Sequence, residues 1–413
     1  MRFGSLLLLA AAAISAPALA ADEDAILAEI DARAAETSDV SRQIWEWAEV
    51  GYLENKSSGL LQKKLKDAGF SVKAGVADIP TAFVAEYGSG GPVIAVLAEF
   101  DALPGINQDA VATRSPIKGK HASHACGHNL FGAGSMSAAI AIAKWLKESG
   151  TQGRIRLYGT PAEEGGSGKV YMVRAGLFDD VDIALECTGF FRTPEKAALH
   201  LKNGSRKVLI SAPGKGDVKT IVYGVNDGLI TAGDTILSNG SCTTNCLAPV
   251  THALHEAFGI KRGHMTTIHS YTGSQPVHDR AHKDLYRARA AALSMIPTTT
   301  GAARTLGVVL PHLDGLISGT AIRVPTPNVS CVDLVVELSK TATESDVNAA
   351  MVDAAKGMHG VMGVTDRKLV SMDFNHDPRS AIFASDQTAM QQGNLLRVMA
   401  WYDNEWGFSN RML

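Results

Sequence analysis

The stretch VDIALECTGFF, residues 181–191, decides the fold, because it reads as one buried strand running into a turn. The segments on its two sides indicate different chemistries. HACGHN (124–129) and PAEEGG (161–166) precede the strand and suggest a metal site, whereas SNGSCTTNCLAP (238–249) follows it and presents a nucleophilic thiol. The question is which enzyme this strand belongs to.

Length and composition indicate a globular protein of roughly two or three domains, since the chain has 413 residues, of which 46% are hydrophobic and 20% charged. A net charge of −3 without a run of Lys or Arg gives no electrostatic reason to expect binding to nucleic acid or to anionic lipid. Beyond the first twenty residues, no stretch is long and apolar enough to predict a membrane span.

The N-terminal segment MRFGSLLLLAAAAISAPALA predicts a secretory signal cleaved before Ala21. It has a basic start, an apolar run and small residues at positions 18 and 20, and the run is short for a buried helix. This predicts a periplasmic or secreted protein with no membrane contact after cleavage. The alternative is the cytoplasm, because the five cysteines are odd in number and do not suggest a disulfide framework.

Residues 22–176 alternate helical and strand patterns, and we expect helices at 22–36 and 57–70 and strands at 81–88, 93–105 and 154–166. Loops at the carboxyl ends of such strands hold ligands in open α/β sheets. Polar groups gather there, with Asp101 after one strand and Glu163 and Glu164 after another.

Cys126 and His128 lie two residues apart in a loop and offer soft donors to one ion, to which Glu164 adds a carboxylate. Glu163 is then free to take a proton from metal-bound water. Each residue alone has a structural explanation, as a buried cysteine, a helix-capping histidine or a solvated acidic pair. Together, at strand ends, they favour a metal site.

Three motifs, AEFDALPG (98–105), HACGHNLFGAG (124–134) and GTPAEEGG (159–166), resemble the zinc-dependent aminoacylase and carboxypeptidase superfamily, in its aminobenzoyl-glutamate hydrolase branch. The resemblance covers about residues 22–185. It implies zinc or another divalent metal bound by Cys126, His128 and Glu164, with Glu163 as the general base. The further histidine ligands and the inserted lid domain of that family do not follow, so half a site is present.

Cys242 precedes the helical pattern TTNCLAPVTHALHEAFG, and unpaired N–H groups at a helix start favour a thiolate. Such a position beside an imidazole lowers a cysteine pKa from about 8.5 to roughly 3.5–7.5. His269, at the end of the expected strand HMTTIHSYT, is the natural partner. Thiolate attack on an aldehyde, with His269 taking the proton and phosphate releasing the acyl group, is the chemistry these residues indicate.

From residue 181 onward the chain resembles phosphorylating glyceraldehyde-3-phosphate dehydrogenase, in motifs that include SNGSCTTNCLAP, MTTIHSYTG (265–273), RVPTPNVS (323–330) and WYDNEWGFSN (401–410). The erythrose-4-phosphate paralogue is not excluded. The resemblance implies NAD, a phosphorylated aldehyde, inorganic phosphate and a homo-oligomer as partners. It also implies roles for seven residues: inorganic phosphate at Ser241, Thr243, Thr300 and Gly301, substrate phosphate at Thr272 and Arg323, and the nicotinamide amide at Asn404.

The dehydrogenase family needs a G-x-G-x-x-G turn for the pyrophosphate of its cofactor, and the 413 residues contain none. GAGSMS (132–137) comes nearest, but close helix packing explains it better. We therefore expect a chimera, joined near residues 180–185, in which cofactor turnover is impaired.

The predicted fold class is α/β, with a composite open parallel sheet over residues 22–240 and then an α+β catalytic domain with a mixed, largely antiparallel sheet. The predicted divisions are a signal peptide (1–20), an amidohydrolase-like fragment (21–180), the second half of an NAD-binding domain (181–240), a catalytic domain (241–400) and a truncated C-terminal segment (401–413). The first functional hypothesis is an NAD-dependent phosphorylating dehydrogenase. The alternatives are a metal-dependent amidohydrolase acting on N-acyl or amino-acid conjugates, and a non-catalytic chimeric product.

Overall fold

A computed structural model describes residues 25–111, 113–202, 204–276 and 278–412. The chain divides into two compact units, with the boundary between Ala184 and Leu185. Unit 1 is the part up to Ala184, together with residues 204–205, and unit 2 is the rest. The predicted signal peptide lies outside the described residues. Among the described helices, none is long and apolar enough to cross a membrane.

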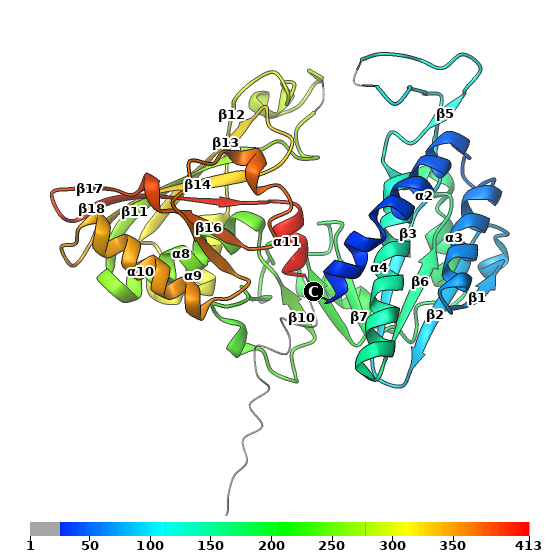
Figure 1. Ribbon diagram of the computed structural model, residues 1–413, viewed down its shortest axis with the longest axis horizontal. Helices are drawn as coiled ribbons and strands as arrows, with labels where there is room; N and C mark the ends of the chain where they lie inside the picture. The colour runs from blue at the N-terminus through cyan, green and yellow to red at the C-terminus, as the bar shows by residue number, and fades with distance from the viewer. Residues whose placement is uncertain (1–24, 112, 203, 277, 413) are drawn as a thin grey trace, which may run out of the picture. The chain divides into compact units, whose positions relative to one another are not determined.

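Unit 1 is a sheet with helices packed on it (Figure 1). Its helices and strands, in chain order, are α2 (Ala34–Trp47), α3 (Asn55–Asp67), β1 (Ser71–Ala74), η1 (Val76–Asp78), β2 (Phe83–Ser89), β3 (Val93–Ala98), β4 (Leu103–Pro104), β5 (Ala122–Ser123), α4 (His128–Ser149), β6 (Gly153–Gly159), α5 (Glu163–Gly166) and α6 (Gly168–Arg174).

The main sheet of unit 1 has the order β1-β2-β6-β3, and β7 (Ile183–Glu186) joins β3 through the pair Ile94 and Ile183. β3 runs parallel to β6 and β7, whereas β2 pairs antiparallel with β1 and β6. Helix α4 packs closely on this sheet, because a Cβ atom at Gly132 would lie 2.7 Å from the Glu99 carbonyl oxygen. Close helix packing is thus confirmed as the reason for the glycine at the start of GAGSMS.

Unit 2 begins inside β7 and contains a small group of strands with one helix, followed by a larger domain (Figure 1). The first part holds α7 (Pro194–Lys202), β8 (Lys207–Ile210), β9 (Lys219–Thr220), η2 (Asp227–Leu229) and β10 (Ile236–Ser238). β10 runs parallel to both β8 and β9. The strands before Cys242 therefore pair mostly in parallel, as expected.

The larger domain contains the remaining elements: α8 (Cys242–Phe258), β11 (Ile260–Ser270), η3 (Leu285–Ala288), β12 (Ile296–Thr299), α9 (Ala302–Val309), η4 (Pro311–Leu313), β13 (Ile317–Val324), β14 (Ser330–Leu338), α10 (Glu344–Gly357), β15 (Met362–Thr365), η5 (Ser371–Phe374), β16 (Ala381–Ala384), η6 (Ser385–Gln387), β17 (Ala389–Gln391), β18 (Leu395–Tyr402) and α11 (Trp406–Asn410).

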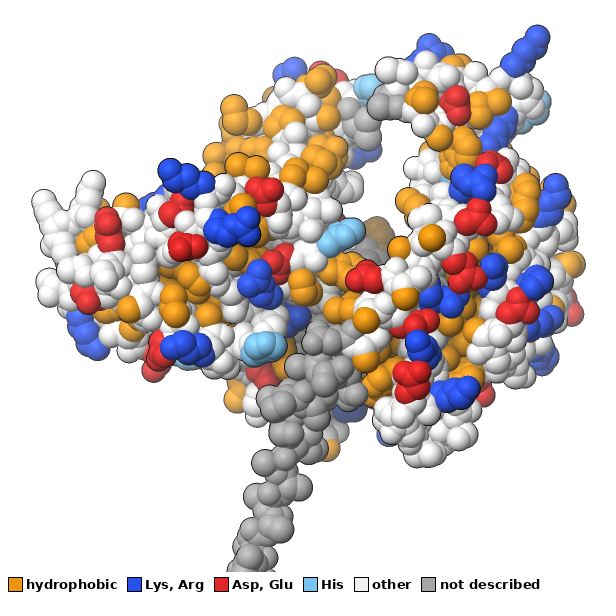
Figure 2. Space-filling model, in the orientation of Figure 1, with side chains coloured by type: hydrophobic (Ala, Val, Ile, Leu, Met, Phe, Trp, Pro, Cys, Tyr) orange, Lys and Arg blue, Asp and Glu red, His pale blue; other side chains and the backbone are white. Residues whose placement is uncertain are grey.

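The sheet of this domain has the order β12-β13-β11-β14-β18-β16-β15, with β17 paired to β18. Only the pairs β11–β13 and β15–β16 are parallel, so the sheet is mixed and largely antiparallel, as predicted. Helices α8, α9 and α10 pack on it, and apolar residues from these helices and from alternate strand positions form one core. Charges of both signs are interspersed on the face shown in Figure 2.

Candidate active site

The thiol of Cys242 lies at the first residue of α8, where the chain leaves the carboxyl end of β10. Ser241 caps the helix, since its Oγ accepts a hydrogen bond of 3.2 Å from the N–H of Thr244. The Cys242 Sγ atom is 3.4 Å from Nε2 of His269, which is buried near the end of β11. The structure therefore brings the two predicted catalytic residues into contact.

Arg323 lies beside His269 because the two residues are register partners on the parallel strands β13 and β11. Its Nη1 atom is 2.7 Å from Nδ1 of His269 and 2.9 Å from the carbonyl oxygen of Ser270. The same Nδ1 atom is 2.8 Å from that carbonyl. Nδ1 thus faces one donor, the guanidinium, and one acceptor, the carbonyl.

The surroundings of Cys242 and His269 favour the neutral form of both predicted catalytic groups. Burial raises the pKa of Cys242 to about 11, although the backbone N–H of Thr243 and the charge of Arg323 act in the opposite direction. Burial, followed by the charge of Arg323, lowers the pKa of His269 to about 4. The sequence-based expectation of a lowered thiol pKa is therefore wrong for this conformation, because removal from water outweighs the helix terminus.

A chain of hydroxyl groups runs behind the thiol. The Tyr402 hydroxyl is 2.9 Å from Oγ1 of Thr243 and 2.8 Å from Oγ1 of Thr267, which donates to the carbonyl of Cys331 at 3.3 Å. The Tyr402 ring also meets the His269 ring edge-on, with centroids 5.9 Å apart. Sequence reasoning missed Tyr402, although it stands in WYDNEWG two residues before the predicted Asn404.

Asn404 is buried and connects to the strand that carries His269. Its Oδ1 accepts hydrogen bonds from the hydroxyls of Ser270, at 2.7 Å, and Ser330, at 2.8 Å. Its Nδ2 donates to Glu405 at 3.0 Å. Sequence reasoning also missed these two serines. The signal that could have found them is that each is a polar residue at a buried strand position.

The residues predicted to bind phosphate occupy four places: the start of α8 (Ser241 and Thr243), β13 (Arg323), the start of α9 and the segment after β11. Thr300 and Gly301 form the start of α9, where the Thr300 hydroxyl accepts from the N–H of Ala302 at 3.2 Å. Thr272 follows β11, and its hydroxyl is 3.0 Å from that of Ser274. Within the described residues, no hydrogen bond joins Thr272, Thr300 or Gly301 to the thiol–imidazole pair.

The backbone N–H groups of the turn after β7 are not free to bind a cofactor pyrophosphate. The Glu186 carboxylate accepts from the backbone N–H groups of Thr188, at 2.9 Å, and Gly189, at 3.1 Å, and contacts Nε2 of His200 at 2.9 Å. These N–H groups therefore already have a partner. Because the sequence also lacks G-x-G-x-x-G, the residues present do not fit the pyrophosphate of a dinucleotide.

In unit 1, His128 is the centre of an acidic cluster. Its Nε2 is 3.1 Å from Glu99 and 3.9 Å from Glu163, while its Nδ1 is 3.1 Å from the Asp101 carboxylate. Ligand atoms of Glu99, His128 and Glu163 all lie within 4.8 Å of one another. The three side chains that could hold one ion therefore include Glu99, which sequence reasoning did not select. They also include Glu163, which it selected as the general base.

The other two predicted metal ligands lie beside this cluster. A hydrogen bond with Glu164, together with burial and nearby carboxylates, raises the pKa of Cys126 to about 11. Glu164 Oε1 is buried and has no hydrogen-bond partner among the described residues. Cys126 and Glu164 therefore pair with each other, outside the group formed by His128.

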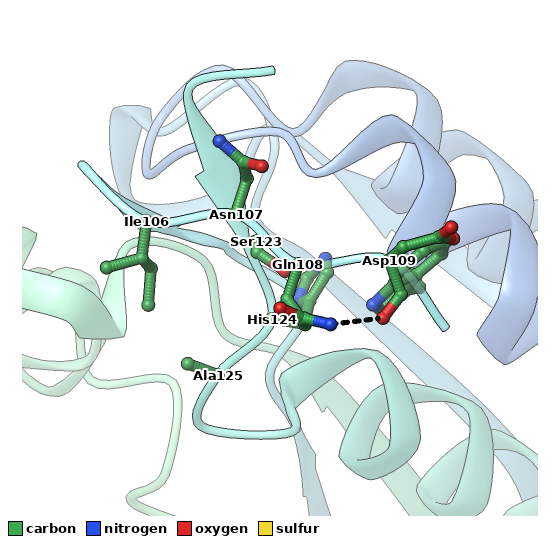
Figure 3. Close-up of a pocket in the computed structure, with 8 residues that line it drawn as sticks. Ile106, Asn107, Gln108, Asp109, Ser123, His124 and Ala125 are labelled. Atoms are coloured by element: carbon green, nitrogen blue, oxygen red, sulfur yellow. Dashed lines mark hydrogen bonds between the residues drawn. The ribbon is translucent and has the colours of Figure 1, made fainter. Parts of the chain in front are cut away.

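A separate cavity of about 290 Å³ opens in unit 1 (Figure 3), where the Gln108 side chain donates to the backbone carbonyl of Asp109 at 3.2 Å. Its lining consists of Trp45, Ile106, Asn107, Gln108, Asp109, Ser123, His124 and Ala125. This lining includes none of the predicted site residues.

A mixed-sheet domain with a cysteine at a helix start, an imidazole at 3.4 Å and a neighbouring guanidinium defines a thiol-dependent catalytic domain. The model of the glyceraldehyde 3-phosphate dehydrogenase C-terminal domain matches residues 241–404. The glyceraldehyde-3-phosphate dehydrogenases of Cereibacter sphaeroides and Xanthobacter flavus are 61% and 57% identical over 233 residues, which are 56% of this chain and 70% of each relative. Glyceraldehyde-3-phosphate dehydrogenase 2 of Bacillus subtilis is 51% identical over 236 residues, 57% of this chain and 69% of the relative. The chain belongs to the glyceraldehyde-3-phosphate dehydrogenase family.

Proposed function

We propose that unit 2 carries the thiol chemistry of a phosphorylating aldehyde dehydrogenase, an oxidoreductase of the glycolytic type. The observation that carries this proposal is the 3.4 Å contact between Cys242 Sγ and His269 Nε2 at the start of α8. The proposed substrates are a phosphorylated aldehyde, either glyceraldehyde 3-phosphate or erythrose 4-phosphate, and inorganic phosphate.

In the first step Sγ of Cys242 attacks the aldehyde carbon, so that a C–S bond forms and the C=O double bond becomes a single bond. The thiol proton passes to Nε2 of His269 and from there to the former carbonyl oxygen. The product is a thiohemiacetal, and the proton count is unchanged. This step needs an unprotonated Nε2 facing the thiol.

Arg323 controls whether Nε2 is unprotonated. While its guanidinium donates to Nδ1, the neutral ring carries its proton on Nε2 and cannot accept another there. A substrate phosphate that draws Arg323 away leaves Nδ1 facing the Ser270 carbonyl at 2.8 Å, which favours a proton on Nδ1. Substrate binding thereby converts His269 into a base for Cys242.

NAD is the electron acceptor that family membership implies, and when bound it supplies the hydride-accepting nicotinamide. The family resemblance assigns that end of the cofactor to Asn404, which is hydrogen-bonded to Ser270, the residue after His269. The pyrophosphate end has no fitting turn, so we expect thiohemiacetal formation without efficient NAD reduction. A chimera joined near residues 180–185 accounts for the missing turn.

The test separates the thiol step from turnover. Purified full-length protein is incubated with glyceraldehyde 3-phosphate and then alkylated with iodoacetamide, and the Cys242 peptide is analysed by mass spectrometry. We expect the phosphorylated aldehyde to protect Cys242 from alkylation, and erythrose 4-phosphate is compared in parallel. NADH production is measured separately. Unprotected Cys242 in folded protein contradicts the proposed thiol chemistry, whereas rapid NADH production contradicts only the impaired cofactor site.

A second candidate function, a metal-dependent amidohydrolase in unit 1, is supported by the cluster of Glu99, His128 and Glu163 and by the unpartnered oxygen of Glu164. A divalent ion held there would supply an activated water. With Lys169 already 2.5 Å from Glu99, we expect weak or substoichiometric zinc at this cluster and no hydrolysis of N-acyl amino acids. Stoichiometric zinc that survives dialysis and is lost in His128→Ala would favour the hydrolase, with Glu46→Gln on the exposed face of α2 as control.

Export to the periplasm is the proposed localisation, because residues 1–20 have the pattern of a secretory signal. N-terminal sequencing of protein recovered from the producing cell tests it, with Ala21 as the expected first residue. An intact Met1 in cytosolic protein would instead support the cytoplasm. A non-catalytic product remains the third proposal, and it predicts neither Cys242 protection nor zinc retained at the His128 cluster.

A further inference from the structure

The end of α8 remote from Cys242 carries a second group of metal-ligating side chains. His252 and Glu256 are four residues apart on this helix and therefore share one face. His312 comes from η4, which follows α9. One ligand atom from each of the three side chains lies within 4.8 Å of the other two.

Neighbouring side chains pack against these imidazoles, but not every imidazole nitrogen has a hydrogen-bond partner in the part of the chain that the structure describes. The His312 ring packs against the ring of His255, with centroids 4.7 Å apart. His255 accepts the N–H of Ile260 at its Nδ1, at 3.1 Å, so it serves as support. Nδ1 of His252 is buried and has no hydrogen-bond partner among the described residues. A buried nitrogen without a protein partner needs a water or an ion, and in such a cluster it is open to a metal.

Two imidazoles and one carboxylate are a donor set for a borderline divalent ion, because imidazole suits zinc, nickel and copper, whereas magnesium and calcium prefer oxygen ligands. Tetrahedral zinc with bonds of 2.0–2.2 Å places its ligand atoms about 3.4 Å apart. The ligand atoms, which lie within 4.8 Å of one another, must therefore move slightly closer together to bind zinc. The side chains of Glu256 and His312 are exposed and can make this movement. Water would complete the coordination.

We propose that His252, Glu256 and His312 form a binding site for a zinc-class divalent cation, which ties α8 to η4. The site is separate from the thiol, since ten residues of helix place His252 about 15 Å from Cys242 along α8. The inference does not depend on the proposed dehydrogenase function. Its expected consequence is a metal-dependent increase in the stability of the domain whose catalytic helix it holds.

The test uses full-length protein with Cys242→Ser and His128→Ala, because the thiol and the unit 1 cluster also attract zinc. The protein is dialysed against Zn²⁺ and then against buffer, and retained metal is counted by mass spectrometry. Further substitutions are His312→Ala, His252→Ala and Glu256→Gln. His264→Ala is the matched control, since His264 is an exposed histidine of the same domain that contacts Ser318 and Thr320.

We expect one retained equivalent of Zn²⁺ in the parent and in His264→Ala, and loss of that equivalent in His312→Ala and His252→Ala, with weaker binding in Glu256→Gln. Bound Co²⁺ should give a visible spectrum without a sulfur-to-metal charge-transfer band. Melting without metal checks folding, and His312→Ala decides the result if His252→Ala unfolds. No retained zinc in the parent, or equal retention in all variants, overturns the proposal.

Discussion

Nη1 of Arg323 lies 2.7 Å from Nδ1 of His269, and the Ser270 carbonyl oxygen lies 2.8 Å from the same Nδ1. The guanidinium and the carbonyl therefore compete for this nitrogen. Because a guanidinium only donates, the contact with Arg323 fixes the proton of the neutral ring on Nε2, beside the Cys242 thiol. The state of the proposed base therefore depends on a residue that the family resemblance assigns to substrate phosphate.

Substituting Arg323→Gln should raise the pKa of His269. Burial is the main cause of the lowered value of about 4 and persists in the variant, but the charge of Arg323, the second cause, is removed. We expect a rise of about 1 unit, within the range that nearby charges produce, measured by NMR titration of the imidazole. Arg397→Gln, which removes a cation paired with Asp333 on the same sheet, is the control and should leave the titration unchanged.

Alkylation of Cys242 by iodoacetamide should accelerate steadily with pH. Because the pKa of the thiol is raised to about 11 and only the thiolate reacts, the rate should rise about tenfold per pH unit between neutrality and pH 10. Buried Cys246 and Cys331 serve as internal controls and should remain unlabelled in folded protein. A plateau below pH 8 would mean that the thiol is more acidic than its surroundings imply. Peptide mass spectrometry gives the rate at each cysteine.

Removing the cap of α8 should affect both stability and reactivity. Ser241→Ala deletes the acceptor for the Thr244 N–H and should cost about 1 kcal/mol. Thr343→Ala is a matched control, since Thr343 caps α10 in the same way through Asp346 and should cost about the same. Only Ser241→Ala should change the alkylation rate of Cys242. Equal rates in the two variants would show that the cap does not orient the thiol; thermal melts give the stability change.

Acid should destabilise unit 1 through His124. Burial lowers its pKa from 6.5 to about 4, so the unfolded chain binds the proton at a higher pH than the folded protein does. The stability gained from the neutral ring is therefore complete above pH 6.5 and falls as the pH drops toward 4, by at most about 3 kcal/mol.

His124→Gln should reduce this acid sensitivity, because glutamine does not titrate. Hydrogen exchange of β3 and β6 at pH 7 and pH 4.5 reports on unit 1 alone. His264→Gln, at an exposed histidine of unit 2, should leave the pH dependence of unit 1 as it was. An unchanged pH dependence in His124→Gln would contradict the assignment.

Hydrophobic periodicity predicted the secondary structure well where apolar positions recur regularly. The expected helix at 57–70 corresponds to α3, and the strands expected at 81–88 and 154–166 correspond to β2 and β6. Strand direction was less predictable, because β2 pairs antiparallel while periodicity is the same for both directions. The α/β class and the mixed second sheet were correct.

The contact between Cys242 and His269 was predictable because motif and chemistry coincide there. The site was not predictable where the deciding factor is position in space. The register that places Arg323 on His269 has no local sequence signal, and Glu99 joins His128 only because α4 packs on the end of β3. The raised thiol pKa likewise depends on burial by distant residues, among which Tyr402 comes from the last strand.

The hydroxyl chain behind Cys242 has a direction. A carbonyl only accepts, so the single proton of the Thr267 hydroxyl goes to Cys331, Tyr402 must then donate to Thr267, and Thr243 must donate to Tyr402. The Thr243 hydroxyl therefore donates its proton to Tyr402, and toward any other neighbour it can act only as an acceptor. A phosphate, itself rich in lone pairs, therefore finds no donor in this hydroxyl, and Tyr402→Phe would change that because the Thr243 proton could then turn outward.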